Sequence, residues 1–284
     1  MIMKRNVFYL GLLVLLVVAM GPEAVAQIKL PPASSAQKVT QGLGINDVEL
    51  TYNRPSMRGR QIFGGLVPYG EVWRTGANTV SSITFAESVT VAGQAVPAGT
   101  YGILTIPNPQ EWTVILSKNS QQWGSYSYSE DEDQLRFKVK PTTLANAVET
   151  FTIDFADVTT NSLRVNISWE NTQVGFDVTV DQDAAIMASI DEAMKGEKKP
   201  YFPAAQYYYN NGKDINKALE WVNEAEKAND KAPHIKYWKA RIQLKAGDKA
   251  GAAATATRGV DIAKAAGNSE YVKLNGDVLE QARR

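Results

Sequence analysis

The sequence of 284 residues contains no cysteine and only one histidine, His234. The absence of cysteine excludes disulfide bonds, thiol nucleophiles and zinc sites with thiolate ligands. A Ser-His-Asp triad is excluded from any domain that does not contain His234. The phosphate-binding patterns GxxxxGK[ST] and GxGxxG are missing as well. We therefore expect no cofactor and no metal, and an enzyme of any of these classes is disfavoured.

Charge of one sign does not dominate either. The chain has 30 lysines and arginines against 30 aspartates and glutamates, a formal net charge of +0. Neither the strong basicity typical of nucleic-acid binding nor the acidity typical of disordered chains is present. Any electrostatic recognition must therefore be local.

The N-terminus has the three parts of an export signal. Lys4 and Arg5 precede an apolar run, Val7 to Met20, and Ala24-Val25-Ala26 supplies a small-x-small cleavage pattern. The run is shorter than the ~20 residues that a membrane-spanning helix needs. We expect residues 1–26 to be removed after Ala26, leaving a periplasmic or secreted protein without a membrane span.

After a flexible leader at residues 27–36, the pattern at 37–181 is that of an all-β domain. Apolar residues alternate with polar ones in several short segments, which is typical of antiparallel strands with one buried face. Residues 88–96 predict a hairpin that turns at Ala92-Gly93. Residues 145–170 contain no glycine or proline, so their strands are expected in the middle of a sheet. The strands predict a sandwich or a barrel.

The periodicity becomes helical near residue 182. Residues 182–200 predict a helix and a linker, and residues 201–284 predict helical hairpins. Asp214 and Asp248 are candidate N-caps. They lie 34 residues apart, which is the tetratricopeptide period, and this alignment places the small residue Ala218 over Ala252. The fold class is thus α+β multidomain, with tetratricopeptide-like helices or, alternatively, ordinary antiparallel helical hairpins behind the β domain.

One irregular stretch, residues 54–78, concentrates arginine, glycine and an aromatic residue. Guanidinium groups suit carboxylates and phosphates, and glycine lets the backbone approach a ligand. The alternative is that the arginines bond main-chain carbonyls of a long connection or, for two of them, pair with the acidic turn at 130–133. The candidate ligand-binding residues are Arg54, Arg58, Arg60, Trp73, Arg74 and Asn78.

Three further groups of residues carry possible chemistry. The aromatic residues Trp123, Tyr126 and Tyr128 could stack on sugar rings or, more commonly for such a pair of tyrosines, belong to the core. The acidic turn at 130–133 could hold calcium, although it lacks the ligand spacing of a calcium loop. Hydrolysis of glycosides needs only two carboxylates at a suitable separation. The candidates by type are Glu71, Asp154, Asp157 and Glu170.

Several motifs resemble a bacterial family, the domain of unknown function 2911. They are YNRPS at 52–56, RGRQIFG at 58–64, VPYG at 67–70, VWRTGAN at 72–78, PAGTY at 97–101, EWT at 111–113 and QWG at 122–124. The resemblance covers about residues 30–180. It implies an exported protein, in some members with tetratricopeptide-like helices behind the domain, and it implies no activity and no catalytic residue.

Together these features favour an exported, non-catalytic binding module for a small anion or an acidic glycan, with helices that contact a protein partner. A carboxylate-based carbohydrate-active hydrolase and a structural envelope protein without a small ligand remain the alternatives. The deciding observation is whether the arginines line an open cleft and whether two carboxylates face them.

Overall fold

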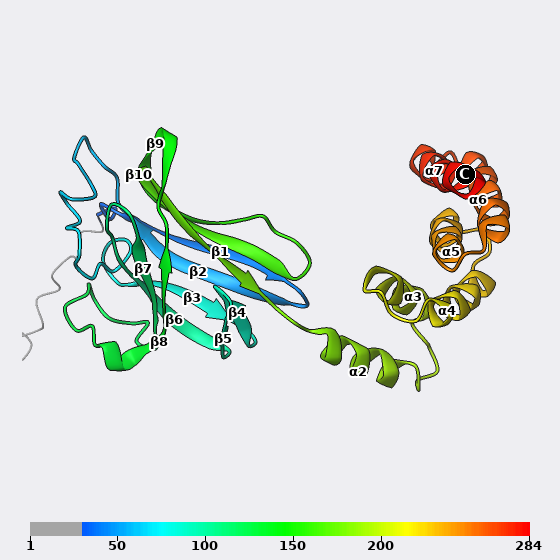
Figure 1. The fold of residues 1–284 in the computed structure, drawn as a ribbon, viewed down its shortest axis with the longest axis horizontal. Coiled ribbons are helices and arrows are strands. Elements are labelled where there is room, and N and C mark those ends of the chain that lie inside the picture. The colour runs from blue at the N-terminus through cyan, green and yellow to red at the C-terminus, as the bar shows by residue number, and fades with distance from the viewer. Residues whose placement is uncertain (1–29) are drawn as a thin grey trace, which may run out of the picture. The chain divides into compact units, whose positions relative to one another are not determined.

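A computed structural model describes residues 30–284 (Figure 1). The chain divides into two compact units, one ending at Val180 and one spanning Asp181–Arg284, and each is described by itself. The expected signal peptide, residues 1–26, lies outside the described residues. The strands of the first unit are β1 (Ser35–Leu43), β2 (Asn46–Arg54), β3 (Ser81–Phe85), β4 (Val89–Val91), β5 (Gln94–Val96), β6 (Gly99–Ile106), β7 (Trp112–Ser117), β8 (Asp133–Val139), β9 (Thr142–Ala156) and β10 (Ser162–Thr179).

These strands form two antiparallel sheets. The six-stranded sheet has the order β1-β2-β3-β6-β7-β8, and the four-stranded sheet has the order β5-β4-β10-β9. Alternating side chains from both sheets build one apolar core, as period-two patterning requires. Tyr52 of β2 joins the sheets, since its hydroxyl donates to the carbonyl of Ile153 in β9 at 2.8 Å. Of the two predicted architectures, a sandwich or a barrel, the sandwich is therefore confirmed.

The long strand β9 corrects one expectation. A segment free of glycine and proline predicted central strands, but β9 lies at the edge of its sheet, whereas its partner β10 is flanked by β4 and β9. Residues 55–57 cover part of this edge: Ser56 bridges Thr150, and the amide of Met57 donates to Glu149 at 2.8 Å. A non-strand segment thus satisfies backbone groups that an edge would otherwise expose.

The predicted turn at Ala92-Gly93 is confirmed between β4 and β5. Both residues have positive φ, 48° and 80°, as a tight two-residue hairpin requires.

Strand β7 is buried on both faces, which simple alternation does not predict. Its outward-facing Ile115 forms a second small cluster with Val80 and Leu104, and Val72 packs against it. The next residue, Trp73, packs instead against the inner core. Connections between strands therefore cover part of the outer face of the six-stranded sheet.

The second unit consists of helices. They are α2 (Asp183–Ala193), α3 (Tyr201–Asn210), α4 (Ile215–Ala228), α5 (Pro233–Lys245), α6 (Lys249–Ala265) and α7 (Ser269–Arg283). Both predicted N-caps are present: Asp214 accepts from the amide of Asn216 at 2.9 Å, and Asp248 accepts from that of Gly251 at 2.8 Å. Ala218 and Ala252 are fully buried, as the alignment of the two helical hairpins predicts. Between residues 30 and 284, no helix combines the length and apolar character needed to cross a membrane.

Candidate functional site

The strand unit contains an open cleft of about 460 Å³. Its walls come from the connection between β2 and β3, from the connection between β7 and β8, and from residues 33–34, while Trp169 of β10 contributes from the sheet. Three arginines of the irregular stretch, Arg58, Arg60 and Arg74, line this one cleft. The sequence singled out these guanidinium groups, and the fold brings them together.

The irregular connection is held in shape by its backbone. Trp73 exchanges two main-chain hydrogen bonds with Thr105 of β6, at 2.8 and 2.9 Å. Gly76 has a φ of 146°, and an added Cβ would lie 2.9 Å from Oγ of Ser81 and 3.1 Å from the carbonyl oxygen of Asn53. Only glycine fits this position without displacing its neighbours. The segment carrying Arg74 is thereby fixed between strands.

Arg74 is the least satisfied of the three guanidinium groups. It is half-buried, and its Nε atom is buried with no hydrogen-bond partner in the described part of the chain. Arginine ion pairs among residues 30–284 involve Arg136, Arg164 and Arg258 instead. An arginine held close to the core without an acceptor is unfavourable, and an anion in the cleft would relieve this.

Arg58 and Arg60 use some of their N–H donors in hydrogen bonds to main-chain carbonyls. The Nη2 atom of Arg58 donates to the carbonyl of Ala33 at 3.3 Å. Arg60 donates from Nε to Met57 at 2.9 Å and from Nη2 to Ser56 at 2.6 Å. A guanidinium carries five N–H donors, so both side chains are oriented by these bonds and keep donors that remain available.

The other three candidates occupy different positions. Arg54 does not line the cleft, and its guanidinium donates to the carbonyl of Phe151 at 3.0 Å and to Oγ1 of Thr152 at 2.8 Å. Asn78 does not line it either, and it bonds Asn53 at 3.3 Å. Trp73 lines the cleft, but its indole is stacked at 5.9 Å on that of Trp169. It forms part of the apolar lining rather than a free stacking face.

The second sequence feature belongs to the same cleft. Tyr126 is 87% exposed and lines it, whereas Tyr128 packs against the outer cluster of the sheet. The two tyrosines were expected to share a strand face, but residues 124–127 form turns. Gly124, with a φ of 72°, allows the ring of Tyr126 to lie where an added Cβ would meet it at 2.7 Å. That same Cβ would lie 3.4 Å from Nη1 of Arg74.

The carboxylates do not converge on the cleft. Of the four candidates for hydrolysis, Glu71 is on the described lining, and Asp154, Asp157 and Glu170 are not. Glu170 instead accepts from the amide of Ile62 at 3.5 Å. The described lining therefore does not supply the second carboxylate that a two-carboxylate hydrolase needs.

The acidic turn is used structurally. Glu130 and Asp133 both pair with Arg136 at 3.0 Å, and Tyr128 donates to Asp133. Burial and the Asp133 hydrogen bond raise the pKa of Tyr128 to about 12. The alternative that Arg58 or Arg60 pairs with this turn is wrong: Arg136 pairs with it, and the guanidinium groups of Arg58 and Arg60 donate to main-chain carbonyls instead. Residues 30–284 contain no cluster of three or more His, Asp or Glu side chains placed to hold a metal ion.

Sequence reasoning did not single out several residues of the cleft, among them Leu66, Ser125 and Trp169. Leu66 is 47% exposed, and this exposure is not visible in the sequence. Trp169 looks like any inward-facing residue of a strand. The tight GS turn after Trp123 is the one signal that could have pointed to Ser125.

The fold and the cleft define a class: an α+β protein whose strand unit carries a cationic cleft and whose second unit is helical. The family model described as "Protein of unknown function (DUF2911)" matches residues 34–178. The chain belongs to this family, which confirms the resemblance of the sequence motifs. No curated protein and no solved structure matches the chain.

Proposed function

We propose that this protein is an exported, non-catalytic binding module whose cleft recognises a small anion or an acidic sugar, and whose helices contact a protein. The proposal rests on the environment of Arg74. Its guanidinium faces the cleft from a half-buried position, with an Nε atom that has no acceptor in the described chain. A carboxylate or phosphate oxygen is the partner that such a planar fork of donors suits.

The rest of the lining supports the same ligand class. Three arginines face one glutamate, so the cleft is locally cationic in a chain that has no net charge. The exposed ring of Tyr126 and the side chain of Leu66 add apolar surface beside the cations. Aromatic faces stack on the apolar faces of sugars, and arginines take their acidic groups. The proposal of a periplasmic or secreted location is supported by the signal-peptide pattern of residues 1–26.

The test is calorimetric titration of residues 27–284 with glucuronate, galacturonate, phosphate and succinate. Arg74→Gln keeps the length of the side chain and removes its charge. Since a hydrogen bond to a charged group contributes about 1.5–3 kcal/mol, we expect the affinity for the bound anion to fall at least about tenfold. Thermal unfolding of the variant shows whether the strand unit is intact.

Arg164→Gln is the matched control. Arg164 lies on β10, pairs with Asp177 at 2.7 Å and does not line the cleft, so this variant changes the net charge equally and should leave the affinity unchanged. Absence of heat with every anion would overturn the proposal. So would equal binding by the wild type and a folded Arg74→Gln variant.

A further inference from the structure

The helical unit contains a second hollow, which is lined by aromatic and cationic side chains. It has a volume of about 420 Å³ and lies between α3, α5 and α7. Arg241 and Lys245 of α5 line it together with Tyr237, which precedes Arg241 by one helical turn. Tyr209 of α3 and Leu274, Asp277 and Val278 of α7 complete much of the wall.

Arg241 is held in this hollow by rings rather than by carboxylates. Its guanidinium carbon lies over the rings of Trp238 at 4.5 Å, Tyr209 at 4.7 Å and Tyr237 at 5.2 Å. Cation–π contacts of this kind fix the position of a guanidinium but use the ring faces, so the N–H donors in its plane stay available. The guanidinium of Arg241 is therefore held in position before a ligand binds, and its N–H donors are available to that ligand.

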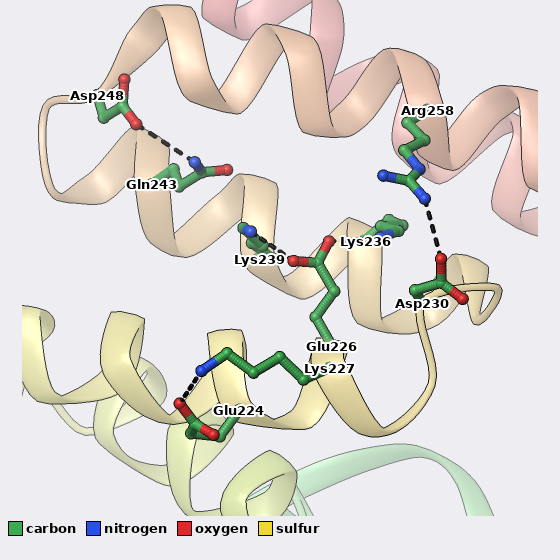
Figure 2. A network of polar contacts seen from close by, with 9 residues as sticks. All are labelled: Glu224, Glu226, Lys227, Asp230, Lys236, Lys239, Gln243, Asp248 and Arg258. Atoms are coloured by element: carbon green, nitrogen blue, oxygen red, sulfur yellow. Dashed lines mark hydrogen bonds and ion pairs between the residues drawn. The ribbon is translucent and has the colours of Figure 1, made fainter.

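The other cations of α5 have partners. Figure 2 shows Lys236 and Lys239 near Glu226 of α4, which accepts from both of them, from Lys239 at 2.6 Å. Lys245 donates to the carbonyl of Tyr209 at 2.8 Å. The arginine ion pairs formed within residues 30–284 do not include Arg241. Asp277, the carboxylate of the lining, is exposed and forms none of the ion pairs found there either.

We infer that this hollow binds an acidic segment of a partner protein, with an Asp or Glu carboxylate of that segment on Arg241. This deepens the proposed role of the helices in protein contact and rests on it. Two cations against one carboxylate make the lining cationic. Leu244 and Leu274, which also line the hollow, suit the apolar residues of a peptide. Stacked helical hairpins present concave surfaces that bind extended partners.

The test uses two fluorescein-labelled octapeptides, one alternating Glu with Leu and one alternating Gln with Leu. Anisotropy is measured on residues 27–284 at low salt. We expect the Glu peptide to bind at least tenfold more tightly than the Gln peptide, and raising the salt concentration to weaken it. Equal binding of the two peptides would overturn the inference, as would displacement of the Glu peptide by succinate at equimolar concentration.

Two charge-matched variants locate the contact. Arg241→Gln should lower the affinity for the Glu peptide at least tenfold. Arg258→Gln should not, because Arg258 lies outside the hollow and pairs with Asp230 at 3.0 Å (Figure 2). Equal affinities in both variants would contradict the assignment to Arg241. Arg241→Lys keeps the charge and is the variant to use if Arg241→Gln does not fold.

The two proposals fail separately. Arg74→Gln should leave peptide binding intact, and Arg241→Gln should leave anion binding in the strand unit intact. A protein that binds glucuronate or phosphate but neither peptide refutes the role of the helical hollow alone. A protein that binds the Glu peptide and no small anion refutes the role of the cleft alone.

Discussion

Glu226→Gln is expected to destabilise the helical unit strongly. The carboxylate of Glu226 accepts from Lys236 and Lys239 across the α4–α5 contact (Figure 2). The side chain of Lys236 is only 1% exposed and that of Lys239 only 17% exposed. The variant leaves the Lys236 ammonium group in the interior without a counter-charge. Removing one partner of a buried pair costs about 3–5 kcal/mol. Because Glu226 itself is 20% exposed, the lower end, about 3 kcal/mol, is expected.

The assay is urea unfolding of residues 27–284 followed by circular dichroism at 222 nm, where helices dominate the signal. Glu224→Gln is the matched control. Glu224 forms an exposed ion pair with Lys227, which lies one turn further along the same helix. Exposed pairs contribute about 0–1 kcal/mol, so this variant should unfold almost as the wild type does. Equal destabilisation by the two variants would refute the reasoning from burial.

A second change checks the cause. Combining Glu226→Gln with Lys236→Met removes the uncompensated charge and keeps an apolar side chain of similar length, so most of the lost stability should return. A double variant as unstable as Glu226→Gln would show that the loss does not come from the buried ammonium group.

The interaction of Glu226 with Lys236 and Lys239 also determines how the stability of the helical unit depends on pH. Burial opposes ionisation of Glu226, but the hydrogen bonds from Lys236 and Lys239 outweigh it, and the pKa of Glu226 is lowered. A lowered folded-state pKa means that the stabilisation is present above the unfolded value, about 4.3, and is lost as pH falls through the folded value. The difference between the wild type and Glu226→Gln should therefore be constant from about pH 7 to 5 and shrink below about pH 4. A difference that grows towards low pH would contradict this sign.

Two other substitutions test local structure. Asp214→Ala removes the oxygen that caps α4 and should lower the free energy of unfolding of the helical unit by about 1 kcal/mol; an unchanged denaturant midpoint at 222 nm would argue against the cap. Gly76→Ala should destabilise the strand unit more than Gly70→Ala does, because both have positive φ but only Gly76 has neighbours within 4 Å of an added Cβ. Thermal unfolding monitored by near-ultraviolet circular dichroism compares the two variants, and equal shifts would show that crowding at Gly76 is unimportant.

Much of the fold could be predicted from the sequence because its signals are local. Period-two alternation located several of the strands, the Ala92-Gly93 pair located a hairpin, and Asp214 and Asp248 located two helix starts. What alternation could not show was the order of strands in each sheet. Residues 145–170 look like central strands because they lack glycine and proline, yet β9 lies at an edge that residues 55–57 partly cover.

The candidate site was predictable in type but not in composition. Four arginines in an irregular stretch indicated recognition of an anion, and three of them line one cleft. The sequence could not show that Arg54 would donate a hydrogen bond to the carbonyl of Phe151, because the two residues are 97 positions apart in the sequence. Nor could it show that Tyr126 lies in the same cleft, because the distance between the two connections is set by the register of β3, β6 and β7.

The cleft is made almost entirely of connections, while both sheets close on a core that most of its residues do not enter. Substitutions at Leu66, Glu71 or Ser125 can thus alter the charge and shape of the opening at small expense to folding. A framework of this kind allows ligand preference to diverge between descendants of one ancestor while the architecture persists.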